Sequence, residues 1–212
     1  MNRIFILFSA LFLCVQASAN EYNAPQLNMS VSKTNDEYIG TLTGHLQATE
    51  HISVSAELDT TGYLELGTGY GFSLGKSYNE VYASYGRGDL IDVYTLGVFS
   101  GFAVTENVLL FGNTSHEWRE LVFDAIDGTR EWKNTVGASY AMHELVKLSY
   151  SFSYDKSLSQ SGHRTYQEVR VTFTPKWVEP YVQYTFGDHR VTPADIKISQ
   201  DATLELGLQF RF

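Results

Sequence analysis

The sequence has no long hydrophobic run after its first residues. From residue 20 onward, no segment approaches the about 18 consecutive apolar residues of a membrane-spanning helix. Cysteine occurs once, at position 14, and proline only four times. These absences exclude a helical membrane protein and an intrachain disulfide framework.

Basic residues are also few. Lysine and arginine total 15 against 24 aspartates and glutamates, which gives a net charge of −9. An acidic chain of this kind is repelled by nucleic acid and by anionic lipid headgroups. We therefore expect no nucleic-acid partner and no electrostatic attachment to anionic lipid.

The first 19 residues have the three-part pattern of a secretory signal. Arg3 precedes an apolar run at 4–15, and Ala17-Ser18-Ala19 supplies the small residues of a cleavage site. Cys14 follows a bulky leucine, which does not fit a lipoprotein signal. We expect a cleaved signal peptide at 1–19.

The remaining chain, residues 20–212, is expected to form a single domain without cysteine and with a net charge of −10. Aromatic residues make up 14% of the sequence, and there are 17 glycines. This enrichment without apolar runs suits strands whose side chains alternate between lipid and a polar interior.

The last twelve residues show the alternation most clearly. On a strand, one face would carry Ala202, Leu204, Leu206, Leu208, Phe210 and Phe212, and the other Thr203, Glu205, Gly207, Gln209 and Arg211. A period-2 pattern that ends on a terminal aromatic residue resembles the closing strand of a Gram-negative outer-membrane β-barrel. A soluble β-sandwich is the alternative.

Alternation along the whole chain predicts an all-β fold, a single antiparallel transmembrane β-barrel of twelve strands, with ten as the other count. The expected segments are 26–33, 38–48, 52–58, 63–73, 78–86, 90–103, 108–118, 130–140, 146–155, 165–174, 178–187 and 201–212. Their connections alternate in length, which predicts short periplasmic turns and longer outer loops. The three long loops are expected at 119–129, 155–164 and 188–200.

The predicted strands also assign positions to the tryptophans and to the charged residues that face inward. Trp118 and Trp132 would mark the outer aromatic belt, and Trp177 the periplasmic one. If apolar residues face lipid, a set of charged residues faces the lumen. The expected lumen acids are Glu57, Glu65, Glu80, Asp92, Glu117, Asp155, Glu168, Glu179 and Glu205, and the expected bases are Arg119, Lys133, Lys147, Arg170 and Arg211.

Small residues also share the expected inner face. Gly67, Gly69 and Gly71 lie on one strand, and the three serines at 149, 151 and 153 on another. Twelve strands lie between barrels that side chains fill and barrels with open pores. Small inward residues favour a narrow channel over a sealed barrel, and the excess of lumen acids predicts a weak cation preference at low salt.

Catalytic patterns are weak. Ser115-His116-Glu117 has suitable residue types, but neighbours on a strand point to opposite faces. Asp188-His189 lacks the spacing of the outer-membrane protease pairs, and the six histidines form no i, i+2 or i, i+4 pair. We expect no enzyme activity, no cofactor and no metal site.

The C-terminal half resembles a known family. The stretch Lys176-Trp177-Val178-Glu179-Pro180-Tyr181-Val182, and the hairpin that starts at Asn134-Thr135-Val136-Gly137 and ends near Tyr154, are similar to the oligogalacturonate-specific porins and their sialic-acid-porin relatives. The resemblance covers about residues 130–212 and implies a monomeric twelve-stranded channel. Those porins conduct acidic saccharides along basic residues, whereas the lumen expected here is acidic, so that specificity is not transferred.

These patterns together predict an outer-membrane channel for passive diffusion of small hydrophilic solutes, with oligosaccharides among the candidates. Outer-membrane lipid would surround it, and the strand ending in Phe212 would be recognised by the barrel-assembly machinery. The alternative is a non-conducting barrel whose outer loops bind a surface partner.

Overall fold

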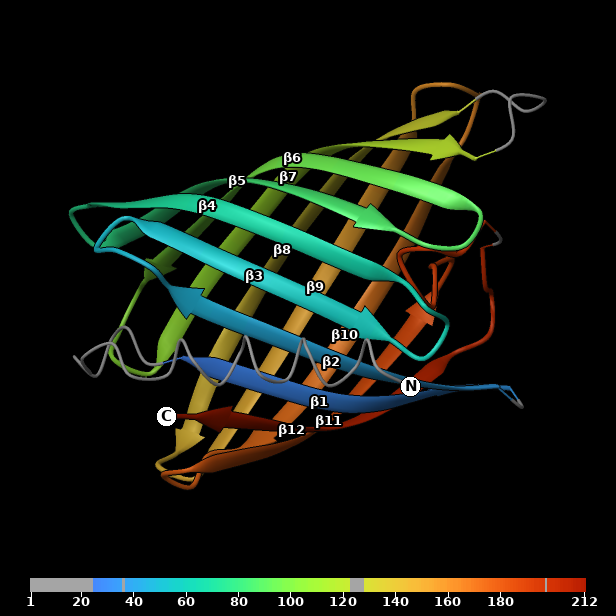
Figure 1. The fold of residues 1–212 in the computed structure, drawn as a ribbon. Helices are drawn as coiled ribbons and strands as arrows, with labels where there is room; N and C mark the ends of the chain where they lie inside the picture. The colour runs from blue at the N-terminus through green and yellow to red at the C-terminus, as the bar shows by residue number, and fades with distance from the viewer. Residues whose placement is uncertain (1–24, 36, 123–127, 197) are drawn as a thin grey trace, which may run out of the picture.

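The computed structural model describes residues 25–35, 37–122, 128–196 and 198–212. The expected signal peptide at 1–19 lies outside them. Within these ranges, no helix is long and apolar enough to cross a membrane. Twelve antiparallel strands form one closed barrel (Figure 1). They are β1 (Gln26–Thr34), β2 (Glu37–Gln47), β3 (Ile52–Asp59), β4 (Leu64–Leu74), β5 (Ser77–Arg87), β6 (Ile91–Ala103), β7 (Val108–Leu121), β8 (Thr129–His143), β9 (Val146–Ser157), β10 (His163–Phe173), β11 (Val178–Gly187) and β12 (Thr203–Arg211).

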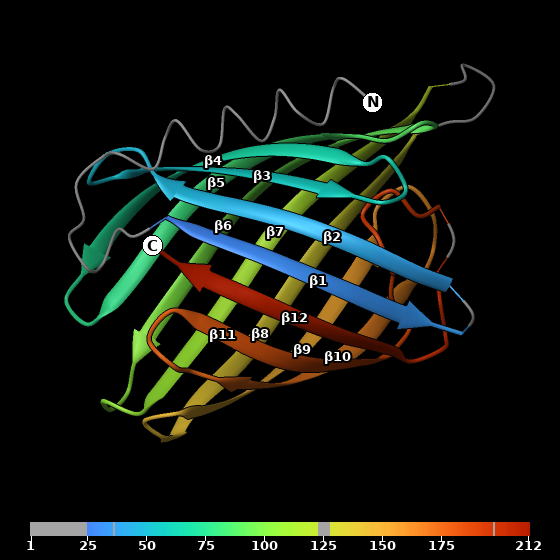
Figure 2. The ribbon, with the colours of Figure 1, turned by 60° about the horizontal axis from the view of Figure 1, so that its bottom comes forward.

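Each strand pairs with its neighbours in the sequence, and the first pairs with the last. β1 and β12 lie side by side in antiparallel register from Gln26 opposite Arg211 to Thr34 opposite Thr203 (Figure 2). This closure leaves no unpaired sheet edge among the described strands, because each of them has two hydrogen-bonded neighbours. The predicted twelve-strand barrel is confirmed, and the ten-strand count and the soluble sandwich are wrong.

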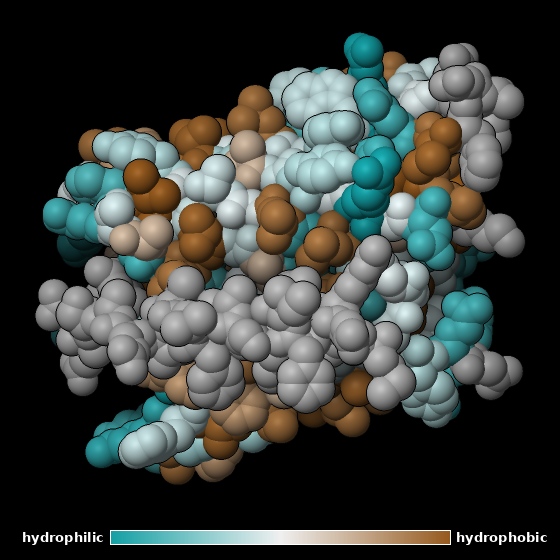
Figure 3. Space-filling view, viewed as in Figure 1, coloured by the Kyte–Doolittle hydropathy of each residue, from teal (hydrophilic) through white to brown (hydrophobic). Residues whose placement is uncertain are grey.

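The barrel is polar inside and apolar outside. On β9, the serines at 151 and 153 and Asp155 are buried, whereas Phe152 and Tyr154 between them are exposed. Hydrophobic side chains are spread over the outer wall in Figure 3. This arrangement reverses that of a soluble protein, and it is the one expected of strands whose outer face contacts lipid.

One end of the barrel carries the start of β1 and the end of β12, where Gln26 lies opposite Arg211, and we call it the terminal end. The connections there are short, at 48–51, 75–76, 104–107, 144–145 and 174–177. The opposite end, which we call the loop end, has connections at 35–36, 60–63, 88–90, 122–128, 158–162 and 188–202. Two of the expected long loops are shorter than predicted because β7 to β10 continue beyond the ends that alternation suggested.

Glycine on the inner face makes room for aromatic rings. A Cβ added to Gly207 of β12 would lie within 2.5 Å of the Tyr181 ring on neighbouring β11. The ring itself is buried, with 4% exposure. Real Cβ atoms do not approach other atoms so closely, so the tyrosine packs flat against the wall only because residue 207 has no side chain.

Candidate channel lumen

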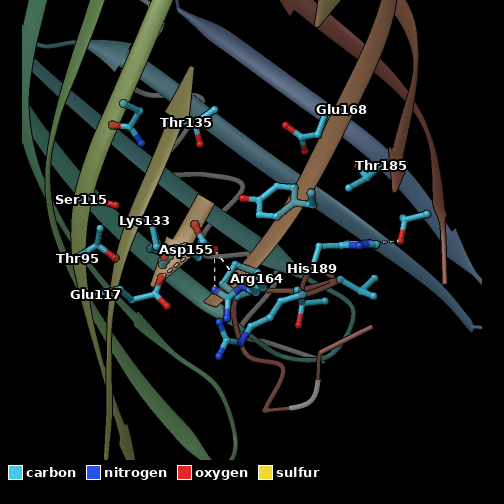
Figure 4. A pocket seen from close by; sticks show the side chains of 18 of the residues that line it. Thr95, Ser115, Glu117, Lys133, Thr135, Asp155, Arg164, Glu168, Thr185 and His189 are labelled. Carbon is cyan, nitrogen blue, oxygen red and sulfur yellow. Dashed lines mark hydrogen bonds and ion pairs between the residues drawn. The ribbon is translucent and has the colours of Figure 1, made fainter. Parts of the chain in front are cut away.

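A cavity of about 430 Å³ occupies the interior near the loop end. We call it the main cavity. Many of its lining side chains are polar or charged. They come from β4 to β12, from Ser32 of β1 and from residues 189–193 of the connection between β11 and β12 (Figure 4). Seven of the residues expected in the lumen line it: Glu65, Glu117, Arg119, Lys133, Asp155, Glu168 and Glu205.

The connection at 188–202 folds into the barrel. We call it the inner loop. Arg119, which is only 3% exposed, donates hydrogen bonds to the carbonyl oxygens of Pro193 (2.6 Å) and Asp195 (2.9 Å). Its third partner is the Glu117 carboxylate, at 2.6 Å. The guanidinium therefore ties the loop backbone to the wall of β7.

A second arginine holds the inner loop to β8. Arg190 donates from both terminal nitrogens to the two carboxylate oxygens of Glu131, at 2.7 and 2.8 Å. Arg164 of β10 binds the same carboxylate at 2.6 and 2.9 Å and also reaches Asp155 at 2.7 Å. We call these four residues the lumen ion-pair network. Bidentate hydrogen bonds between an arginine and a carboxylate are geometrically specific and strong.

His189 fixes the start of the inner loop. Its two ring nitrogens lie 2.9 Å from the Gly187 carbonyl oxygen and 2.7 Å from the Thr203 hydroxyl, and the ring is 4% exposed. A bridge between the backbones of His189 and Ser199 closes the loop on itself. The inner loop is therefore anchored at its base as well as along its length.

Charged residues expected in the lumen also lie near the terminal end. Arg170 stacks on the Tyr181 ring, with 3.7 Å between the guanidinium carbon and the ring centroid, and lies 3.8 Å from Glu205. Arg211 pairs with Glu179 at 3.0 Å. Lys147 follows the alternation of the inward serines on β9 and forms no ion pair within the described residues.

The acids of β3 to β5 have neutral partners. Glu57 accepts a hydrogen bond from the Thr43 hydroxyl at 3.2 Å, and Glu80 accepts one from Ser53 at 2.5 Å. Glu65 accepts one from the Tyr63 hydroxyl at 2.5 Å. Burial, together with the neighbouring Glu65, raises the pKa of the Tyr63 phenol far above its usual range, so the hydroxyl remains a donor.

Asp92 does not face the lumen, contrary to the prediction. It lies opposite Arg87 on β5 and pairs with it at 3.0 Å, on the face that carries the outward Tyr85 and Tyr94 rings. The residues on either side of Asp92 are Ile91 and Val93, which are buried and pack with Tyr63 inside the barrel. The rule that apolar residues face lipid fails at this small internal apolar cluster.

Sequence reasoning also missed four charged residues of the lumen. Glu131 falls in the expected strand at 130–140 and Arg164 in the expected loop at 155–164, and each continues the inward alternation of Lys133 and Tyr166. That spacing was the signal that could have found them. Asp59 lies one residue beyond the expected end of its strand, and Arg190 comes from the inner loop, which no strand periodicity predicts.

The residues of the weak catalytic patterns are separated as expected. Ser115 and Glu117 line the main cavity, whereas the His116 ring packs beside Trp118 with ring centroids 4.1 Å apart. The described residues contain no group of three or more His, Cys, Asp or Glu side chains that could hold a metal ion.

The barrel is similar in fold to solved structures of outer-membrane proteins. The NanC porin superposes with a TM-score of 0.73 at 10% identity, covering 89% of this chain and 100% of that one. The chain shares the porin fold. The KdgM porin in complex with disordered oligogalacturonate gives a TM-score of 0.71 at 13% identity, covering 88% of this chain and 99% of that one.

A more distant match to the porin fold is an outer-membrane channel from Pseudomonas putida F1. Its TM-score is 0.59 at 9% identity, and the alignment covers 93% of this chain and 100% of that one. Neither the protein-family models nor the curated protein sequences give a match to this chain. The resemblance predicted from the C-terminal half is thus confirmed at the level of the fold.

Proposed function

We propose that the chain is an outer-membrane channel for passive diffusion of small hydrophilic solutes, short oligosaccharides among them. The observation that carries this proposal is the polar, partly hollow interior of a closed barrel whose outer wall is apolar. A closed barrel satisfies its backbone hydrogen bonds within lipid, and small polar residues inside leave room for water.

The outer surface supports a location in the outer membrane of a Gram-negative bacterium. Trp132 is 52% exposed near the loop end, and Trp177 is 80% exposed at the terminal end. Exposed tryptophans at both ends suit the two membrane interfaces. The terminal end would then face the periplasm, as the short turns and the expected signal peptide require.

The C-terminal strand supports the expected assembly route. Phe210 and Phe212 stack with ring centroids 6.4 Å apart, and Phe212 donates its backbone amide to the Pro25 carbonyl oxygen. An aromatic residue at the end of the last strand suits recognition by the barrel-assembly machinery. We propose a monomer that uses no cofactor and catalyses no reaction.

The alternative function is a non-conducting barrel whose outer loops bind a surface partner. The inner loop disfavours it, because this connection is directed into the barrel by Arg119 and Arg190 and not outward. The connection at 158–162 is short as well.

Planar-bilayer recording tests the channel. Mature protein, residues 20–212, refolded in detergent and added at low concentration should produce discrete conductance steps. Detergent alone and heat-unfolded protein are the controls. Swelling of liposomes that carry the barrel, in neutral saccharides of increasing length, would measure the size limit. A folded barrel without conductance steps at any voltage or salt concentration would contradict the proposal.

A further inference from the structure

A second cavity lies across the inner loop from the main cavity. It has a volume of about 190 Å³ and is bounded by β1 to β3, by Glu205 and by residues 191–193 of the loop. We call it the side cavity. Its charged lining residues are Glu57, Asp59 and Glu205, and none of its lining side chains is basic. The cavity is therefore a negatively charged space inside the barrel.

Two acceptors of the side cavity lack donors. Asn28 Oδ1 and Asp59 Oδ2 are buried and receive no hydrogen bond from the described residues. Asp59 is only 6% exposed. Its other oxygen accepts the backbone amides of Thr61 (2.8 Å) and Tyr63 (3.1 Å), which fix the carboxylate in place. A buried acceptor without a donor is destabilising, so a ligand that donates hydrogen bonds here would recover that loss.

The remaining carboxylates of the side cavity are only partly balanced. Glu57 has the Thr43 hydroxyl as its hydrogen-bond donor. Glu205 accepts hydrogen bonds from the hydroxyls of Tyr181 (2.6 Å) and Ser32 (3.0 Å), and Arg170 lies 3.8 Å away, beyond hydrogen-bond distance. Acceptors predominate, and negative charge is left over. A cationic donor is complementary to both features.

We propose that the side cavity binds the primary ammonium group of a small organic cation. An ammonium group has three N–H donors and no acceptor, which matches the unpaired oxygens of Asn28 and Asp59 and the carboxylate of Glu57. The volume corresponds to about six water molecules at about 30 Å³ each, enough for a group the size of ethylammonium. A directly coordinated metal is not supported by the described residues.

The role of this site in transport rests on the proposed channel. Glu205 and residues 191–193 line both cavities, so a cation held in the side cavity would sit beside the route through the main cavity. Fixed negative charge along a low-dielectric wall concentrates cations. The site would favour amine-bearing solutes over acidic saccharides.

Binding is tested on the refolded barrel in detergent, by titration calorimetry with ethylammonium chloride. Tetramethylammonium chloride is the matched probe, because it carries the same charge without N–H donors. We expect ethylammonium to bind about tenfold more tightly than tetramethylammonium, the loss expected when a charge-assisted hydrogen bond is removed. Glu57→Gln should weaken ethylammonium binding by a similar factor. Asp92→Asn, which removes an acid from the outer face, should not.

A second variant covers the case in which Glu57→Gln fails to fold. Asn28→Ala removes an unpaired acceptor of the side cavity without changing charge, so it should also weaken ethylammonium binding. Equal affinity for the two ions, or equal affinity of the Glu57→Gln and Asp92→Asn variants for ethylammonium, would overturn the proposed binding site.

Bilayer recording of the same samples separates the two proposals. Conductance without ammonium binding removes only the side-cavity site, and binding without conductance removes only the channel.

Discussion

Arg190 on the inner loop meets Glu131 on β8 through two parallel hydrogen bonds of 2.7 and 2.8 Å. The two residues are 59 positions apart, and both side chains are about nine-tenths buried. Their contact joins the connection between β11 and β12 to the barrel wall at β8. The position of the inner loop within the lumen depends on this pair and on Arg119.

Replacing Arg190 should widen the channel. Arg190→Ala removes the two hydrogen bonds to Glu131, while Arg164 still neutralises that carboxylate. The barrel should therefore remain folded while the loop loses an anchor. Removing one partner of a buried pair costs about 3–5 kcal/mol where the other is left uncompensated, and less is expected here. We expect single-channel conductance to rise by about twofold, since pore width limits flow.

Arg87→Ala provides the matched control. Arg87 also pairs with an acid, Asp92, but on the outer face, where its side chain is 62% exposed. Its replacement should leave conductance unchanged. An Arg190→Ala channel with wild-type conductance would show that the pair does not determine the width of the pore.

The strands were predictable because each has a simple two-residue period. On β12, Leu204, Leu206 and Leu208 are exposed to the outside, as alternation requires. The inner loop was not predictable, because nothing in residues 188–202 indicates whether a connection folds outward or inward. Its direction is set by Arg119 and Glu131, which are distant in sequence.

Inward charges were predicted where polar and apolar residues alternate strictly. Lys133 and Glu117 follow such an alternation, and both line the main cavity, where they pair at 2.9 Å. Asp92 was misplaced because a tertiary apolar cluster lies inside the barrel. Which charges pair with one another could not be predicted, since pairing depends on register between strands.

A methyl group at position 207 should destabilise the barrel. In Gly207→Ala, the new Cβ would overlap the buried Tyr181 ring, which also stacks on Arg170. Overpacking of this kind costs about 1–3 kcal/mol. We expect the variant to unfold at a lower temperature, measured by the shift from folded to unfolded mobility on gels after heating.

Gly112→Ala is the control for this substitution. An added Cβ there meets only the Thr135 carbonyl oxygen, at the ordinary contact distance of 3.7 Å. Its unfolding temperature should equal that of the wild type. Equal stability of the Gly207→Ala and Gly112→Ala variants would show that the Tyr181 ring can move aside.

Deleting Phe212 should impair assembly more than stability. The Phe212 side chain is 58% exposed, so few contacts within the barrel are lost. The terminal residue is the expected recognition element for the barrel-assembly machinery. We expect less protein in the outer-membrane fraction of cells, but the same yield of folded barrel when the purified variant is refolded in detergent. Equal losses in both assays would assign Phe212 a structural role.

The wall of β3 to β5 should give the channel a weak preference for cations. Glu57, Glu65 and Glu80 are bonded to hydroxyl groups, so their charge is not cancelled by a base. The bases on the opposite wall are mostly paired with acids of their own strands or neighbours. A field from unpaired carboxylates attracts potassium over chloride at low salt, and it is screened beyond about 10 Å at 0.1 M.

The reversal potential under a potassium chloride gradient measures this preference. We expect a cation-selective potential at low salt that declines as ionic strength rises. Combining Glu57→Gln, Glu65→Gln and Glu80→Gln should remove most of it, because the acidic wall then carries no charge at these positions. The outer-face variant Asp92→Asn should keep it. An anion-selective wild type would instead mean that Lys147, Arg170 and Arg211 dominate the lumen, and would favour acidic saccharides as the solutes.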